Sequence, residues 1–477
     1  METAIVVVFI LGYLAITLEH SLKIDKLVPA LLMMAVAWAL VAIGIDGFDT
    51  WFDSHNSSLL DIGDEGHEDR MHRLEGTLLH HFGKTCEILI FLVGAMTIVE
   101  IIDHFNGFAT IKKFIRTNKK RMLLWIMCIL AFVLSAIIDN LTATIVLVTI
   151  LRKLLPENKD RIWFASLIII AANAGGAWSP IGDVTTTMLW IGKRVTTLKL
   201  IEFLILPSLV CMVVPTFLAS LLPAFKGNFE SSEDTGELNK RGPLMLYLGL
   251  LLIVSVPVFK TVTHLPPYVG MMLSLGIVAL VAEFISARQF SITDKNAAAD
   301  PHSGHMQSPT FRALSKIEMP SILFFLGILM TVAALESLGM VFRFGQDVQA
   351  TMSPDLFVLL LGVGSAVIDN VPLVAASMGM FDMNEMVDGV RIYDKDAAIW
   401  HFIAYSAGTG GSMLIIGSAA GVVAMGMEKI SFFWYLRKIA WLALIGFVAG
   451  GLVFIGMKST GMMDPADSNT VQLEQTH

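Results

Sequence analysis

The sequence predicts an all-α polytopic membrane protein built from two inverted repeats. The fold class follows from an apolar composition, from long apolar runs between polar segments, and from a repeated Asp-Asn motif. Of the 477 residues, 55% are hydrophobic and 16% are charged, whereas soluble domains carry about 25% charged residues. A soluble chain of this composition could not cover its surface with polar groups, which excludes a cytosolic enzyme and a disordered protein.

Apolar runs long enough to cross a bilayer, about 20 residues, occur throughout the chain. The simple runs are 4–22, 27–45, 86–105, 199–223, 243–260, 266–286, 319–340 and 432–456. Two longer runs, 161–191 and 396–427, contain Gly-rich breaks, and two more, 121–155 and 354–382, contain an Asp-Asn pair. We expect discontinuous transmembrane helices in the first two and re-entrant helical hairpins in the other two, which gives ten crossings and two hairpins.

The order of these elements repeats along the chain. Residues 135–140 read Ser-Ala-Ile-Ile-Asp-Asn, and residues 365–370 read Ser-Ala-Val-Ile-Asp-Asn. The Gly-rich breaks that begin at Asn173 and Ser406 match at an offset of 233 residues. This register places Ile416 opposite Asp183, so the predicted site is asymmetric.

Positive charge predicts the orientation of the chain. With the N-terminus outside, the basic clusters within 112–121 and 152–161 fall on the cytoplasmic side, as the positive-inside rule favours. One hairpin then opens to the cytoplasm and the other to the outside, which makes the repeats inverted, as in secondary transporters. The predicted domains are 1–223 and 243–457, with a cytoplasmic linker at 224–242 and a polar C-terminal tail at 458–477.

Three aspartates lie within apolar stretches and are the candidate functional carboxylates. Asp139 and Asp369 occupy equivalent places in the repeated motif, without a Lys or Arg nearby in sequence, and Asp183 lies at the first break. An ionised Asp in hydrocarbon costs at least about 2.5–3.5 kcal/mol on insertion scales, so it persists where it is compensated. A helix cap is the alternative interpretation, and the duplication in opposite repeats disfavours it.

Side chains with oxygen atoms surround these carboxylates. They are Ser135, Asn140 and Thr142 near Asp139, Ser365 and Asn370 near Asp369, Asn173, Thr185 and Thr186 at the first break, and Ser406, Thr409, Ser412 and Ser418 at the second. Oxygen ligands suit hard cations, although small residues at a break also permit tight helix packing. Burial favours a protonated carboxylate and a bound cation favours an ionised one, so one site can exchange Na⁺ for H⁺.

Other classes of function have weaker support in the sequence. It contains no His-Glu-x-x-His, Gly-x-Ser-x-Gly or Walker motif, so hydrolytic and ATP-driven activities are not expected, and we expect no cofactor. The net charge of −8 gives no reason to expect nucleic-acid binding. An intramembrane enzyme with an aspartate dyad remains an alternative, which the separate hairpins disfavour.

These motifs resemble those of the NhaD-type Na⁺/H⁺ antiporters of the ion transporter superfamily. The resemblance covers nearly the whole chain and rests on 135–140 with Thr142, on 173–186, on 365–370 and on 406–412. Related divalent-anion/Na⁺ symporters read Ser-Asn-Thr at the hairpin tips, whereas the tips here read Asp-Asn-Leu-Thr and Asp-Asn-Val-Pro. Because an Asp at each tip would repel a dicarboxylate, cation/proton antiport is favoured over Na⁺-coupled organic-anion symport.

The resemblance also implies properties that spacing does not show. It implies a bacterial inner membrane, a homodimer, and a transport domain that moves against a dimeric scaffold. It implies that Na⁺ or Li⁺ exchanges with H⁺ at Asp139, Asn140, Asp369 and Asn370. Coordination would be completed by Asp183, Thr185, Thr186, Ser135 and Ser365.

Overall fold

The computed structural model describes residues 1–17, 22–53, 58–115, 117–229, 241–293, 308–381, 386–387, 390–391 and 393–463. Most of the predicted linker (residues 230–240) and most of the predicted tail (residues 464–477) lie outside the described residues.

The first half of the chain is helical apart from one short hairpin. Its helices are α1 (Glu2–Thr17), α3 (Leu27–Ile43), α4 (His67–His104), α5 (Lys120–Ile138), α6 (Asn140–Leu154), α7 (Asn158–Gly176), α8 (Val184–Ile191) and α9 (Thr197–Ser220), with 3₁₀ turns η1 (Ile45–Gly47), η2 (Gly107–Phe114) and η3 (Pro223–Phe225). Between α3 and α4, strands β1 (Thr50–Asp53) and β2 (Ser58–Asp61) pair antiparallel, with Trp51 opposite Leu60.

The second half has the same character. Its helices are α10 (Gly242–Thr263), α11 (Pro267–Thr293), α13 (Pro309–Lys316), α14 (Met319–Ser337), α15 (Met340–Thr351), α16 (Pro354–Gly364), α17 (Asn370–Met380), α18 (Ala398–Gly410), α19 (Ala419–Glu428), α20 (Phe432–Lys438) and α21 (Ala440–Ser459). Strands β3 (Met386–Val387) and β4 (Val390–Arg391) form a second antiparallel pair.

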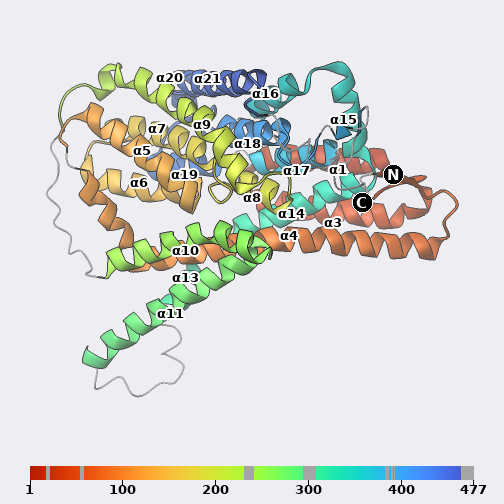
Figure 1. The fold of residues 1–477 in the computed structure, drawn as a ribbon, viewed down its shortest axis with the longest axis horizontal. Coiled ribbons are helices and arrows are strands. Elements are labelled where there is room, and N and C mark those ends of the chain that lie inside the picture. The colour runs from red at the N-terminus through yellow and green to blue at the C-terminus, as the bar shows by residue number, and fades with distance from the viewer. Residues whose placement is uncertain are drawn as a thin grey trace, which may run out of the picture.

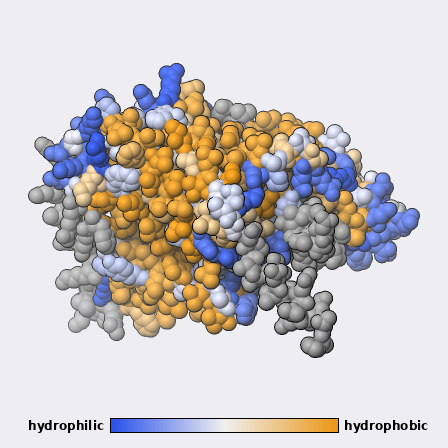
Figure 2. Space-filling view, turned by 45° about the horizontal axis from the view of Figure 1, so that its top comes forward, coloured by the Kyte–Doolittle hydropathy of each residue, from blue (hydrophilic) through white to orange (hydrophobic). Residues whose placement is uncertain are grey.

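The prediction of an all-helical polytopic membrane protein is confirmed, apart from these two short strand pairs. Among the described residues, 7 helices are long and apolar enough to cross a membrane, namely α4, α5, α9, α10, α11, α14 and α21. Helices α1, α3, α16, α17 and α19 are apolar but shorter. Figure 2 shows hydrophobic residues over the middle of the molecule and hydrophilic residues gathered toward its two ends, as expected for a protein that spans a bilayer.

The helices form two groups that pack side by side (Figure 1). In the first group, α1 and α14 pack on α3, and α4 and α10 pack on α11. In the second group, α5 packs on α7, α16 on α18, and α9 on α21. Contacts of α14 with α17 and of α4 with α8 join the two groups. The elements that carry the predicted site residues therefore belong mainly to the second group.

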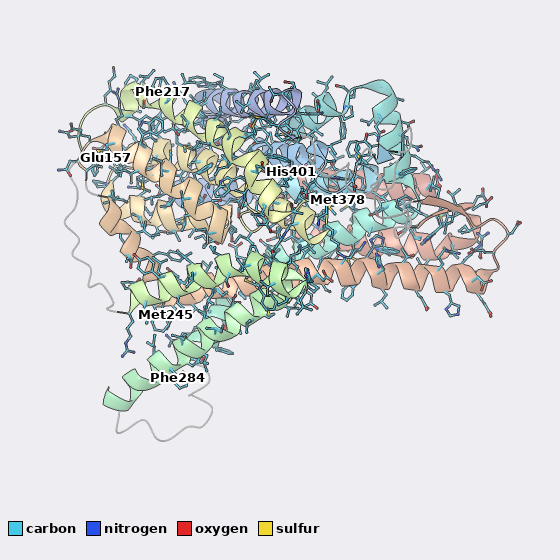
Figure 3. All side chains as sticks on the ribbon, viewed as in Figure 1. Glu157, Phe217, Met245, Phe284, Met378 and His401 are labelled. Atoms are coloured by element: carbon cyan, nitrogen blue, oxygen red, sulfur yellow. The ribbon has the colours of Figure 1, made fainter. Side chains whose placement is uncertain are left out.

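The two ends of the molecule differ in which loops they hold. Glu157, in the turn between α6 and α7, lies at one end of the long axis (Figure 3). The N-terminus lies toward the opposite end (Figure 1). Arg152, Arg161 and Lys120 belong to the end near Glu157, where Lys120 pairs with Asp160 at 2.5 Å.

Candidate cation site

Asp139 forms the tip at which α5 ends and α6 begins. Its carboxylate caps α6, because Oδ1 accepts the Thr142 backbone N–H at 2.7 Å and Oδ2 accepts the Thr142 hydroxyl at 3.0 Å. The backbone of Asp139 has φ 79° and ψ 158°, a region that is almost confined to glycine and costs about 1–3 kcal/mol. The fold thus holds a strained residue at this tip with its carboxylate in a fixed position.

Asp369 forms the corresponding tip between α16 and α17. Its Oδ1 accepts the Val371 backbone N–H at 3.4 Å. Its Oδ2 lies 3.2 Å from the Nζ of Lys26, the residue just before α3. The expectation that Asp369 has no basic partner was wrong, since proximity in sequence misses a lysine 343 residues away.

The two Gly-rich breaks are irregular segments between short helices. The first separates α7 from α8, and the second separates α18 from α19. Asp183 caps α8 with φ −150° and ψ 151°, and Ser418 caps α19 with φ −145° and ψ 152°. Equal backbone angles at the same capping position make these two residues equivalent. The true offset is therefore 235 residues, and Ser418 rather than Ile416 stands opposite Asp183.

Each tip segment is fastened to its neighbouring break by the same contacts. Ser135 Oγ donates to the Ala172 carbonyl at 2.6 Å, and Ser365 Oγ donates to the Ala407 carbonyl at 2.9 Å. Close backbone contact accompanies these bonds, because a Cβ on Gly410 would lie only 2.1 Å from the Gly362 carbonyl oxygen. The serines of the repeated motif therefore position the tips and do not face the carboxylates.

Gly410→Ala is expected to destabilise the protein by about 1–3 kcal/mol, because the added methyl group must push the α16 and α18 backbones apart. Gly364→Ala is the matched control, since a Cβ there meets nothing within 4 Å. Thermal unfolding of the purified protein in detergent measures both. Equal melting temperatures for the two variants would contradict the close contact.

Asp183 lies at the centre of a buried polar cluster that joins both tips. Asn370 Nδ2 donates to Asp183 Oδ2 at 3.0 Å, and Asn140 Nδ2 lies 3.5 Å from Asp183 Oδ1. Asn140 Nδ2 also donates to Asn173 Oδ1 at 3.0 Å. Thr185 Oγ1 donates to Asp183 Oδ2 at 2.6 Å. One carboxylate, 4% exposed, thus receives an amide from each repeated motif.

Asn173 extends the cluster to the second break. Its Nδ2 donates to Ser412 Oγ at 2.9 Å and to Ser418 Oγ at 3.0 Å. Within the described part of the chain, no three His, Cys, Asp or Glu side chains gather as a metal-binding group. The cluster therefore combines one carboxylate with amides and hydroxyls, a set of hard oxygen ligands that suits an alkali cation better than a transition metal.

The structure brings only some of the predicted site residues together. It unites Asn140, Asn173, Asp183, Thr185, Asn370 and Ser412. Thr186 bonds to the Asp183 carbonyl at 2.9 Å and Thr409 to the Tyr405 carbonyl at 2.6 Å. Ser406 Oγ is buried and has no hydrogen-bond partner among the described residues. Asp139 and Asp369 flank the cluster with partners of their own.

A cavity of about 250 Å³ reaches the first tip. Thr142, which donates to Asp139, forms part of its wall. Glu100, Asp103 and Glu318 give the wall an acidic character, and Lys316 lies 3.8 Å from Glu100. A cation that enters this cavity would meet carboxylates along its way to Asp139.

Comparison with known proteins places the chain in a family. Residues 7–400 match the family model CitMHS, described as "Citrate transporter". The chain is 40% identical to "Sodium/proton antiporter 1" of Arabidopsis thaliana over 96% of its length and 72% of that protein. It is 30% identical to "Na(+)/H(+) antiporter NhaD" of Vibrio cholerae over 93% of its length and 89% of that protein.

A solved structure supports the fold independently. The Alcanivorax borkumensis YdaH transporter superposes with a TM-score of 0.56 at 14% identity, covering 91% of this chain and 100% of that one. The prediction of a transporter rather than an enzyme is confirmed by the family match. The chain is a multi-pass membrane protein of the CitMHS transporter family, and its resemblance to the NhaD-type sodium/proton antiporters is confirmed.

Proposed function

We propose that the protein exchanges Na⁺ or Li⁺ for H⁺ across the membrane, with cation and proton competing for intramembrane aspartates. The observation that carries this proposal is the single buried carboxylate of Asp183, which receives the amides of both Asn140 and Asn370. The names of the relatives from a plant and from Vibrio cholerae support the same function.

The cluster has the chemistry that such competition needs. With their N–H groups toward Asp183, the two amides stabilise an ionised carboxylate. Turned over, the same amides offer carbonyl oxygens to a cation, because each Asn side chain carries both an acceptor and a donor. A proton on the carboxylate removes the negative charge that attracts the cation. Binding of either ion therefore opposes binding of the other, and Asp139 and Asp369 would extend this competition to the two tips.

The proposal includes the finer architecture. The α5–α6 tip with the α7–α8 break, and the α16–α17 tip with the α18–α19 break, would be re-entrant hairpins and discontinuous helices of two inverted repeats. The shared contacts at both breaks support this relation. A homodimer in a bacterial inner membrane, with the second helix group moving against the first, completes the proposal.

Symport of an organic anion with Na⁺ is the second candidate. The description of the matching family as citrate transporters favours it. The carboxylates of Asp139, Asp183 and Asp369 at the tips and break oppose it, because a citrate or dicarboxylate would face like charges. Uptake of labelled citrate or succinate, with and without Na⁺, separates the two functions.

Everted membrane vesicles with a pH-sensitive dye test the antiport. Adding Na⁺ or Li⁺ should discharge an imposed proton gradient, and Asp139→Asn and Asp369→Asn should each abolish that response. Asp355→Asn is the matched control, since Asp355 lies at the exposed start of α16 and pairs with Lys458 at 2.7 Å. Full exchange by both tip variants would refute the proposed role of the tips. Anion uptake that requires Na⁺, without dye recovery, would replace antiport by symport.

A further inference from the structure

Lys26 places a positive charge on the second tip. Its ammonium lies 3.2 Å from Asp369 Oδ2 and 4.4 Å from the ring centroid of Phe324. The two charged side chains are only 25% and 16% exposed. An ammonium between a carboxylate and an aromatic face is held by both, because the ring quadrupole also attracts cations.

The ion pair joins the two helix groups. Lys26 precedes α3, which packs against α14, the helix that carries Phe324, in the first group. Asp369 caps α17 in the second group. Asp183, in the central cluster, and Tyr13 of α1 also lie within electrostatic reach of Asp369. A change of charge at Asp369 is therefore felt both by the central cluster and by the contact between the groups.

A lysine ammonium and Na⁺ carry the same single charge. One carboxylate in a sheltered place is neutralised by one of them, and a second cation beside it would be repelled. When Asp369 is ionised without Na⁺, Lys26 supplies the missing charge and reduces the cost of a carboxylate in a poorly solvated place. When Na⁺ occupies the carboxylate, the ammonium loses its partner.

We propose that Lys26 is a tethered cation that competes with Na⁺ for the carboxylate of Asp369, so that Na⁺ binding at the second tip displaces the ammonium and breaks the contact between the two helix groups. This inference rests on the proposed Na⁺ transport and deepens it, because it names a positioning residue that sets how readily Na⁺ binds and when the groups separate.

The competition has a measurable size. The apparent affinity for Na⁺ falls by the fraction of molecules in which the carboxylate is free. If the ion pair is formed in about nine molecules of ten, removing the ammonium lowers the half-saturating Na⁺ concentration roughly tenfold. Lys26→Met suits this purpose, because its side chain keeps the apolar contact with Phe324 and loses the charge.

The experiment compares four proteins in the vesicle assay over a range of Na⁺ concentrations at fixed pH. Lys26→Met should reach half-saturation at roughly one tenth of the wild-type Na⁺ concentration. Lys26→Arg keeps the charge and should remain near the wild type. Lys23→Met, on the exposed turn before Lys26, should match the wild type. Wild-type half-saturation in Lys26→Met, or an equal shift in Lys26→Arg, would overturn the inference.

A second measurement distinguishes failure of this inference from failure of the proposed function. Na⁺ should raise the melting temperature of the detergent-solubilised protein, and Lys26→Met should need less Na⁺ for the same rise. This reads binding without transport. A wild type that shows Lys26-dependent stabilisation but no exchange would refute antiport and support the competition. Stabilisation with the same Na⁺ dependence in both proteins would refute the competition alone.

Discussion

Asp183→Asn is expected to abolish Na⁺/H⁺ exchange. Asp183 is the only carboxylate in the cluster described above, and the amides of Asn140 and Asn370 both point at it. An asparagine there cannot neutralise a cation or take up a proton at neutral pH. Removing one partner of a buried charged pair costs about 3–5 kcal/mol, which corresponds to a loss of at least roughly 100-fold in exchange.

The vesicle assay measures this loss, and gel filtration in detergent checks that the variant folds. Ser418→Ala is the informative comparison, because Ser418 occupies the equivalent capping position at the second break and carries no charge. It removes one hydroxyl that accepts from Asn173 at 3.0 Å. We expect a reduction of a few-fold, in keeping with about 1 kcal/mol for a neutral hydrogen bond. Exchange at wild-type rates by folded Asp183→Asn would place the cation elsewhere.

The local features of the site could be predicted from the sequence. An Asp within an apolar run, glycines at a break and a repeated motif are all visible in a few consecutive residues, and these patterns indicated both tips and both breaks. Convergence could not be predicted. Nothing in the sequence states that Asn140 and Asn370, 230 residues apart in number, would meet at Asp183, or that Lys26 would reach Asp369.

The register between the halves shows a second limit. Matching letters favoured an offset of 233 residues and paired Asp183 with Ile416. The structure pairs Asp183 with Ser418, because the first residue of a helix is defined by the backbone N–H groups that need an acceptor. Both residues supply a side-chain oxygen to those groups, and isoleucine has none.

The polar segment 46–85 hides structure for a different reason. It was expected to be a loop, yet it contains the β1–β2 hairpin and the beginning of α4. Helix α4 has 38 residues, about 57 Å at 1.5 Å per residue, and so exceeds the hydrocarbon thickness of about 30 Å. Its polar N-terminal part therefore carries no apolar run that would indicate a membrane helix.

Glu428→Gln is expected to produce the largest loss of stability. Glu428 ends α19, and its side chain is fully buried. Its Oε1 lies 2.7 Å from Arg152 Nε at the end of α6, and its Oε2 lies 2.8 Å from Arg161 Nε on α7. Asn158 donates to Oε2 at 3.1 Å. One carboxylate thus binds the second repeat to the first at the end of the molecule near Glu157.

A glutamine keeps the shape of this residue but leaves two guanidinium groups without a counter-charge. Breaking a buried ion pair in this way costs about 3–5 kcal/mol, and we expect the lower part of that range because Arg152 is 44% exposed. Asp355→Asn, which removes the exposed pair with Lys458, should cost only about 0–1 kcal/mol. Denaturant unfolding in mild detergent measures both free energies. If Glu428→Gln unfolded at the same denaturant concentration as Asp355→Asn, the cluster would not hold the halves together. A large loss with exchange retained per folded molecule would show that Glu428 joins the repeats into one unit without taking part in ion binding.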